Sequence, residues 1–444
     1  MTLRRLYEPA AYAAGALDGA YWPETCAVPD FAPLEGEAEA DAAVIGAGYT
    51  GLSAALTLAR AGLSVRVLDL HGPGWGASGR NGGFCCLGGA KLSRAGMTAR
   101  WGADGRAAWC RTEVEAVRLA ETRIAELGLD VDRHSDGEVI LAHSERAMAQ
   151  ISAEASLLAA EYGVTPLVLS AGSLAERGMR VAGVQGGLHL PLGFALNPRK
   201  YAAGLAQGAV AAGARIHGSS PVTRVLRDGT DYLLETPKGR LRARRLVVAT
   251  NGYAAETLPG WMRWRTLPVQ SSVLVTRVLT RDEQAAQGWT APLMAYDSRH
   301  LLHYFRLLPE GRFLFGMRGG IRWTPETHRD IRARMERDFA AMFPGWAGVE
   351  HTHFWSGLAC LTRDLVPCLA PIGDWPGAVA AFGYHGNGVA MGTWAGDRAA
   401  RMVLGQAPAL PPMLGRATRR FELGPFRRLA LRGAYLWYGW QDRA

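Results

Sequence analysis

Hydrophobic positions along this chain switch between short continuous runs and stripes at helical spacing, a pattern typical of strands that alternate with helices. The switch is clearest between Asp41 and Asp69. An apolar run ends at Ile45, a glycine-rich turn and a helical stretch follow, and a second apolar run occupies Val65–Leu68. The pattern predicts a strand–helix–strand unit whose second strand ends in an acidic residue.

The same reasoning places further elements along the chain. Residues 1 to about 38 resemble an extended lead-in rich in aromatic and polar residues, and Pro198 suits the first turn of a helix. In chain order we then predict a helix over about 106–127, a strand at 138–142, a helix at 147–162, a helix at 199–212, a strand at 214–217, a hairpin with turns at 228–229 and 238–239, an apolar strand from 245 that ends in a turn at 252, short mostly antiparallel strands over 262–330, a strand at 379–382 and a helix through 404.

The elements that suit a nucleotide site are scattered, so we expect one domain to be interrupted by another. The predicted fold is α/β, with a Rossmann-type dinucleotide-binding domain that is discontinuous in sequence and an inserted α+β substrate domain built on a mostly antiparallel sheet. We assign 36–98, 195–255 and 355–410 to the dinucleotide-binding domain, 99–194 and 256–354 to the substrate domain, and 411–444 to a basic, aromatic C-terminal tail.

The turn after the first strand carries Gly46, Gly48 and Gly51 in a Gly-x-Gly-x-x-Gly arrangement. The first glycine permits the tight turn, the second lets a pyrophosphate approach the backbone, and the third lets the helix lie close to the sheet. The helix N-terminus offers free N–H groups to phosphate, and Asp69 lies where an acid accepts hydrogen bonds from the adenosine ribose. Together these residues predict a dinucleotide site.

Composition narrows the possible functions. All but three of the 49 basic residues are arginine and the formal net charge is +9, yet no basic run interleaved with aromatic residues indicates nucleic-acid binding. Six cysteines without repeating Cys-x-x-Cys spacing indicate neither a disulfide framework nor a zinc site, and His351 and His353 have no nearby acid or cysteine to complete a metal site. These observations predict no metal and no nucleic-acid partner. No signal peptide or membrane-spanning run is recognisable in the sequence, so we expect a cytoplasmic protein.

Four segments resemble the D-amino-acid-oxidase-like family of FAD-dependent oxidoreductases, and within it the branch of γ-glutamylputrescine oxidases. They are the Gly46-x-Gly48-x-x-Gly51 turn, the block Gly-Trp-Gly-Ala-Ser-Gly-Arg-Asn-Gly-Gly at 74–83, the block Ala-Thr-Asn-Gly-Tyr at 249–253, and the turn Gly-Tyr-His-Gly-Asn-Gly at 383–388. The resemblance covers roughly residues 20 to 440. It implies FAD as the cofactor, because a second Gly-x-Gly-x-x-Gly unit, which a nicotinamide enzyme of the two-dinucleotide type needs, is absent from the sequence.

The resemblance implies a set of FAD-binding residues in the turns that follow the strands. We predict that the cofactor is bound by Gly46, Ala47, Gly48, Tyr49, Thr50, Gly51, Asp69, Leu70, Gly76, Ala77, Ser78, Arg80, Asn81, Gly82, Gly83, Val222, Thr250, Asn251, Gly252, Gly383, Gly386, Gly388 and Val389. The helix that begins near Val389 would direct its positive end at the flavin edge that gains negative charge on reduction.

The chain also departs from its relatives at three positions. In sarcosine-oxidase-like relatives a cysteine attaches the flavin, and here Gly357 takes its place, so we expect a non-covalent FAD. The lysine that promotes the reaction with oxygen is matched by Leu314, and the lysine that binds a substrate carboxylate is matched by Ala390.

Four side chains are candidates for contact with the substrate. His385 lies on the turn at 383–388, which we call the flavin turn, and could accept the amine proton. Asn387 lies on the same turn, in the position that relatives give to histidine. Tyr304 and Arg306 alternate on one strand and share a face, and an arginine there could bind a substrate carboxylate. The alternatives are structural: a histidine bonded to backbone in a tight turn, and an arginine in an interdomain ion pair.

The leading hypothesis is a flavoenzyme that oxidises the C–N bond of a primary or secondary amine, γ-glutamyl-polyamine or amino-acid-like, with oxygen as the acceptor. A second is a dehydrogenase of the same fold that passes electrons to a quinone or carrier protein. A third is a flavin- or nucleotide-binding module without catalysis. The tail at 426–440 mixes arginines with large apolar residues, which allows peripheral membrane contact, although a helix docked on its own FAD-binding domain is the favoured interpretation.

Overall fold

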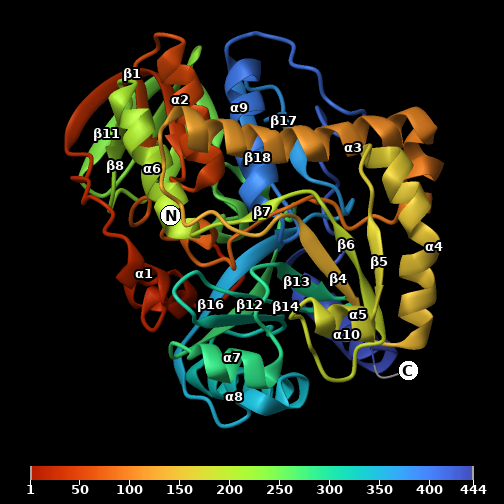
Figure 1. Ribbon diagram of the computed structural model, residues 1–444. Coiled ribbons are helices and arrows are strands. Elements are labelled where there is room, and N and C mark those ends of the chain that lie inside the picture. The colour runs from red at the N-terminus through yellow and green to blue at the C-terminus, as the bar shows by residue number, and fades with distance from the viewer. Residues whose placement is uncertain (1–2, 443–444) are drawn as a thin grey trace.

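The computed structural model describes residues 3–442 and contains two eight-stranded sheets with helices packed around them (Figure 1). The helices are α1 (Trp22–Thr25), α2 (Tyr49–Arg60), α3 (Arg94–Glu126), α4 (Glu145–Tyr162), α5 (Ala171–Glu176), α6 (Pro198–Ala211), α7 (Arg281–Gln287), α8 (Pro325–Met342), α9 (Gly388–Val403) and α10 (Arg427–Gln441). Within the described residues, none of these helices combines the length and the apolar character needed to cross a bilayer.

The first sheet is the one that the glycine-rich turn predicts. Its central strands are parallel, and antiparallel strands flank them at β17 and at the β9–β10 hairpin. Its main path runs β17 (Cys368–Pro371), β18 (Ala378–Phe382), β11 (Gly239–Val248), β1 (Gly36–Ile45), β2 (Val65–Leu68) and β8 (Arg215–His217), and β10 (Asp231–Glu235) pairs with β11 and with β9 (Arg224–Asp228). Three turns far apart in the sequence, after β1, β11 and β18, therefore meet at one edge of the sheet.

The second sheet is mostly antiparallel, with one parallel pair between β13 and β4. Its order is β16 (His351–Leu361), β12 (Leu267–Thr276), β15 (Phe313–Arg318), β14 (His303–Leu307), β13 (Met294–Asp297), β4 (Glu138–Ala142), β6 (Gly186–Leu190) and β5 (Leu167–Ser170). A short pair, β3 (Phe84–Cys85) with β7 (Phe194–Ala195), forms a third sheet. Strands 138–142 and 378–382 lie where the sequence predicts them, and the 198–211 and 388–403 helices agree with it within a few residues.

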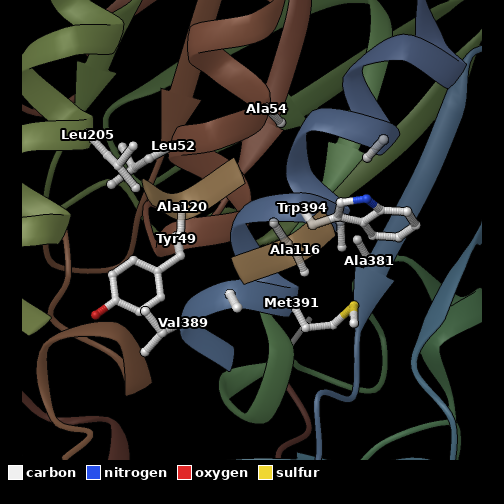
Figure 2. Close-up of a cluster of buried hydrophobic side chains, with 14 of the residues drawn as sticks. Tyr49, Leu52, Ala54, Ala116, Ala120, Leu205, Ala381, Val389, Met391 and Trp394 are labelled. Atoms are coloured by element: carbon white, nitrogen blue, oxygen red, sulfur yellow. The ribbon is translucent and has the colours of Figure 1, made fainter. Parts of the chain in front are cut away.

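The largest hydrophobic core lies between the first sheet and the helices α2, α3, α6 and α9. Figure 2 shows Leu52 of α2 beside Leu205 of α6, and Trp394 of α9 near Ala381 of β18. The α3 helix, which we assigned to a segment of the substrate domain, contributes Ala116 and Ala120 to this same core. Burial of such apolar surface stabilises the protein by roughly 25 cal/mol per Å² removed from water.

The α2 helix approaches its neighbours so closely that two positions have no room for a side chain. A Cβ atom on Gly51 would lie 1.8 Å from the carbonyl oxygen of Gly46, and one on Gly396 would lie 2.1 Å from the carbonyl oxygen of Thr50. Hydrogen bonds reinforce the α2–α9 contact, because Ser53 Oγ donates to the Thr393 carbonyl at 2.7 Å. The glycines thus fix both the depth of α2 on the sheet and its distance from α9.

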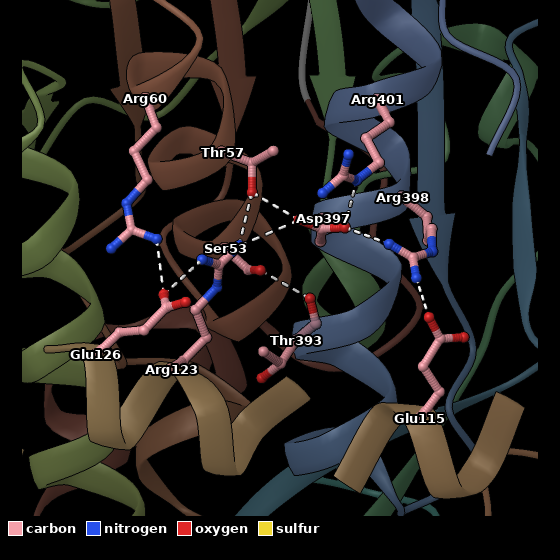
Figure 3. Close-up of polar contacts among 10 residues, drawn as sticks. All are labelled: Ser53, Thr57, Arg60, Glu115, Arg123, Glu126, Thr393, Asp397, Arg398 and Arg401. Carbon is pink, nitrogen blue, oxygen red and sulfur yellow. Dashed lines mark hydrogen bonds and ion pairs between the residues drawn. The ribbon is translucent and has the colours of Figure 1, made fainter. Parts of the chain in front are cut away.

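A buried carboxylate joins three helices at this interface (Figure 3). Asp397 of α9, whose side chain is 1% exposed, accepts hydrogen bonds from Thr57 of α2 at 3.0 Å and from Arg123 of α3 at 3.1 Å. Its other oxygen accepts from Arg398 at 2.5 Å and Arg401 at 2.9 Å. Burial alone would raise the pKa of Asp397, but the hydrogen bond from Arg401 and the neighbouring guanidinium charges hold it below its ordinary value.

Two terminal segments differ from the sequence-based interpretation. The N-terminal lead-in is folded onto the protein, since Trp22 of α1 is buried and its Nε1 donates to the Asn81 carbonyl at 2.9 Å. The tail forms α10 but does not dock only on the FAD-binding domain. Its Leu431 packs with Leu267 and Val269 of β12, because a buried apolar face on α10 meets that strand.

We expect Asp397→Asn to destabilise the fold by about 3–5 kcal/mol, because it leaves buried guanidinium groups without their counter-charge. The stability that Asp397 contributes is present above the ordinary aspartate pKa and is lost as the pH falls through its lower folded-state pKa. Urea unfolding of both proteins, followed by circular dichroism near neutral pH and near pH 3, measures both effects.

Asp374→Asn is the matched control, since Asp374 is 91% exposed and lies 3.8 Å from Arg227. Its removal should change stability by less than about 1 kcal/mol. Equal losses for the two variants would contradict the role given to Asp397.

Candidate active site

A single continuous cavity of about 920 Å³ connects the turns of the first sheet with strands of the second. At one end it is lined by Gly46 and Asp69, and at the other by Tyr435 and Tyr438 of α10. This volume, with a lining drawn from both sheets, suits a cofactor with room left for a small substrate.

The Asp69 carboxylate at the β2 end is held by backbone N–H groups. One oxygen accepts from Ala47 at 2.7 Å, and the other accepts from His71 at 2.9 Å and Gly72 at 2.8 Å. Burial is the largest influence on its pKa and raises it, while these three hydrogen bonds act in the opposite direction. The remaining acceptor site on Oδ2 can accept from a ribose hydroxyl, as the sequence predicts.

Two helices begin at the cavity, and most of their first backbone N–H groups have no partner within the described residues, although the Tyr49 N–H of α2 donates to Ser78 Oγ at 3.0 Å. The N-cap of α2 is Gly48, which has no side chain to cap the helix, and Asn387 before α9 makes no side-chain capping bond. Both Gly48 and Gly388 line the cavity. Uncapped N-termini are favourable positions for phosphate and for negative charge on a flavin ring.

The 76–83 loop is held in place by contacts of its own side chains. The Arg80 guanidinium lies 4.2 Å from the ring centroid of Trp75, and its Nε donates to the Trp75 carbonyl at 2.9 Å. Asn81 accepts from the backbone of Gly83 at 2.7 Å and donates to the carbonyl of Ser78 at 3.0 Å. These side chains therefore fix the loop, while its backbone faces the cavity.

The structure brings most of the predicted cofactor residues to this one cavity. All but five of them line it. The five that do not are Ala47, Gly51, Gly83, Gly252 and Gly383. The four glycines among them lie where a Cβ atom would come within 2.6 Å of a neighbouring atom, so they support the turns from behind.

The His385 imidazole is not free to take a substrate proton, which corrects our interpretation. Its Nε2 lies 3.2 Å from the Thr362 backbone N–H, which donates to it, and its Nδ1 lies 2.8 Å from the Gly89 carbonyl. An accepting Nε2 requires the proton on Nδ1, so both ring nitrogens are used. Burial lowers the pKa of His385 to about 3, and the neutral ring ties the Gly89 loop to the flavin turn.

Arg306 does not line the cavity, which also corrects our interpretation. Its Nε and Nη2 each donate at 2.8 Å, to the carbonyls of Gly82 and Leu196 respectively, and its Nη1 lies 2.7 Å from His134 Nε2. The guanidinium has no donor directed at a substrate. Arg306 shares a face of β14 with Tyr304, but the loop that contains Gly82 covers this part of the strand.

Tyr304 and Asn387 do line the cavity. The Tyr304 hydroxyl lies 3.1 Å from Ser271 Oγ, and its ring packs edge-on against Phe84. The Asn387 amide donates to the Leu87 carbonyl at 2.9 Å, so it joins the flavin turn to the loop that follows β3. Tyr304 is therefore the predicted side chain best placed to contact a substrate.

Two cations that the sequence reasoning missed face the cavity together. Lys91 and Arg318 both line it, and among the described residues neither forms an ion pair. The Arg318 Nη2 donates to the His385 carbonyl at 3.3 Å, and no described group accepts from the Lys91 amine. The neighbouring charge on Arg318 is the largest influence on the pKa of Lys91 and lowers it to about 7. Lysine is rare in this chain, and its position after Gly88-Gly89 was the available signal.

The two positions at which relatives carry a lysine do not line the cavity. Leu314 packs with Val273 and Trp355, Ala390 packs in the core of the first sheet, and neither lines the cavity. Gly357 does line the cavity and offers no side chain. Cys360 also lines it, but burial raises the pKa of this thiol to about 12, so it stays protonated.

Comparison with known proteins agrees with this geometry. The profile of the family described as FAD dependent oxidoreductase matches residues 41–402. A probable oxidoreductase OrdL of Rhizobium meliloti is 29% identical over 432 residues, covering 94% of this chain and 95% of that protein. The γ-glutamylputrescine oxidoreductase of Escherichia coli is 28% identical over 367 residues, covering 83% and 84%.

Among solved structures, glycine oxidase from Geobacillus kaustophilus shares the fold. It superposes with a TM-score of 0.69 at 21% sequence identity, covering 84% of this chain and 96% of that one. The two-sheet architecture predicted from the sequence is confirmed, as is FAD as the cofactor of the family. The chain belongs to the D-amino-acid-oxidase (DAO) family of FAD-dependent oxidoreductases.

Proposed function

We propose that this enzyme oxidises the C–N bond of a primary or secondary amine that also carries a carboxylate, such as an amino acid or a γ-glutamyl amine. The observation that carries the proposal is the charge of the cavity. Lys91 and Arg318 face it without an acidic partner, and among the described residues Asp69, at the adenosine end, is the one carboxylate that lines it. A bare polyamine would meet only like charge there, whereas an anionic group would be bound by both cations.

The bound FAD would supply the acceptor for the hydride that leaves the carbon next to nitrogen. The residues of the chain position the substrate and adjust its charge. With its carboxylate held by Lys91 and Arg318, the amine would lie in a positive field without a nearby acid, which lowers its pKa and favours the uncharged form. The Tyr304 hydroxyl, which is hydrogen-bonded to Ser271 Oγ, could accept a hydrogen bond from that nitrogen or donate one to it.

Loss of a hydride and a proton gives an imine, which water hydrolyses, and the two electrons pass on to oxygen to give hydrogen peroxide. The cationic cavity supports oxygen as the acceptor, since reduction of oxygen creates negative charge. The alternative, transfer to a quinone or carrier protein, is supported by the exposed apolar face of α10.

We place the reaction in the cytoplasm, because all six cysteines are free and five are buried, which suits a reducing compartment.

Related γ-glutamyl chemistry supports the same substrate class. The γ-glutamylputrescine oxidoreductase that matches this chain acts, by its name, on a putrescine with a γ-glutamyl group, and such a group keeps its α-carboxylate. We propose a substrate of this general form here, with the carboxylate at Lys91 and Arg318 and the reacting nitrogen nearer Tyr304.

The FAD should be non-covalent, since Gly357 offers no side chain and the Cys360 thiol is protonated. Acid precipitation of the yellow protein should leave the flavin absorbance in the supernatant. Flavin that stays with the pellet after acid and denaturant would contradict this expectation.

An anaerobic flavin-reduction screen tests the function itself. Amino acids, N-methyl amino acids and γ-glutamyl amines should bleach the flavin absorbance, and putrescine or other amines without a carboxylate should do so far more slowly. Admission of air should restore the colour with formation of hydrogen peroxide. Fast reduction by bare polyamines alone would refute the carboxylate assignment, and reoxidation only by an added quinone would refute oxygen as the acceptor.

The affinity for an anion should fall as the pH rises above about 7. Lys91 is protonated below its pKa of about 7, and a bound carboxylate raises that pKa, so binding is strongest below pH 7 and weakens above it. Glutarate, which has carboxylates but no amine, can be titrated by its effect on the flavin spectrum. Lys91→Met or Arg318→Met should weaken its binding about 10- to 100-fold near pH 6, and Lys91→Met should also flatten the pH dependence.

Arg363→Met provides the matched control, because Arg363 also lines the cavity but pairs with Glu422 at 2.7 Å. Its effect on glutarate binding should stay within about threefold. An unchanged pH profile in Lys91→Met would remove Lys91 from the proposed anion site.

A further inference from the structure

We propose that the outer face of α10 docks the enzyme on an anionic lipid bilayer. Of the large hydrophobic side chains exposed among the described residues, about half belong to the short segment 423–440. They include Leu436 at 71%, Trp437 at 56% and Trp440 at 63% exposure.

These side chains form one stripe rather than a scatter. The set is Phe426, just before α10, and Leu429, Leu436, Trp437 and Trp440 within it. Their successive spacings are three, seven, one and three residues, so at 3.6 residues per turn they occupy an arc of about 100°. The two tryptophan rings lie next to each other, with centroids 5.3 Å apart. We call these five residues the outer stripe.

The opposite face of the same helix is already occupied by the protein. Leu431, Ala434, Tyr435 and Tyr438 line the cavity, and Leu431 packs on β12. The C-terminal end is fixed too, because Asp442 accepts from the backbone of Leu301 at 3.0 Å. Figure 1 shows α10 at the periphery of the second sheet, beside the C-terminus. The outer stripe is therefore held rigidly outward and has no partner within the described chain.

The charges around the stripe favour an anionic surface as its partner. Residues 416–440 contain six arginines and a single acid, Glu422. Arg419, Arg420 and Arg432 are exposed, and among the described residues no ion pair involves Arg420 or Arg432, whereas Arg416 lies over the ring of Trp101 in α3. Arginine beside tryptophan and leucine on a surface helix is the composition of helices that lie in the interface of an anionic bilayer.

Shape and symmetry argue against the other occupants. A second copy that met this face across a two-fold axis would bring its arginines against their counterparts, at a cost in like-charge repulsion. The stripe is also a convex ridge on a single helix, whereas helix and peptide recognition needs a groove on one partner. A bilayer requires no such complementary shape. Docking would place the α10 wall of the cavity at the membrane surface.

Co-sedimentation of the purified, FAD-loaded full chain with vesicles tests the proposal. The protein should bind vesicles of phosphatidylcholine mixed with phosphatidylglycerol, bind pure phosphatidylcholine less, and be released by salt, because the arginine contribution is screened. The double variant Trp437→Glu/Trp440→Glu should weaken binding at least about tenfold. Its flavin content and melting temperature establish that it is folded.

Leu157→Glu/Val278→Glu is the matched control, since these residues are about half exposed but lie outside the tail. It should bind vesicles like the wild type. If the tryptophan variant fails to fold, Arg420→Glu/Arg432→Glu replaces it and should lose binding to the anionic vesicles alone. Absence of vesicle binding by the wild type would overturn the proposal. So would equal binding by all variants, or a dimer in solution that Trp437→Glu/Trp440→Glu dissociates without any effect of lipid.

Discussion

The structure depends on how closely α2 lies against its neighbours. At one end the missing side chain of Gly51 lets the helix sit on the turn after β1, and along one side Gly396 lets α9 reach the α2 backbone. Because α2 comes from residues 49–60 and α9 from 388–403, this contact joins two distant parts of the chain around one cavity. Asp397 then adds a third helix, α3, and the uncapped starts of α2 and α9 are left facing the same space.

The cavity combines two electrostatic arrangements that suit different parts of its contents. At the cofactor end, backbone N–H groups and helix N-termini favour phosphates and a flavin that gains negative charge. At the other end two cations remain without a counter-charge. Two like charges that lie near each other without a counter-charge repel each other, so a site that keeps Lys91 and Arg318 unpaired is poised for an anion that arrives with the substrate. The same positive field disfavours a charged amine.

Two of the polar side chains that the sequence offers as catalytic candidates are structural in this enzyme. His385 spends both ring nitrogens on backbone groups, and Arg306 holds the Gly82 loop against the chain near Leu196. Positioning is thus the main task of the polar groups around the flavin turn. The α10 helix has two different faces in the same region. One face lines the cavity, and the other is exposed and apolar.

The sequence by itself determined the elements whose signal is local. The strand–turn–helix–acid unit at 41–69 follows from periodicity and glycine spacing, because these depend on neighbours a few residues apart. The α/β fold and FAD as the cofactor follow from the family resemblance. Tertiary structure alone decided which way polar side chains point. Local pattern places Arg306 and Tyr304 on one strand face but cannot show that a loop covers the first and leaves the second open. It also cannot show that Lys91 and Arg318, more than two hundred residues apart, meet in one cavity, because that contact is made only when both sheets are packed together.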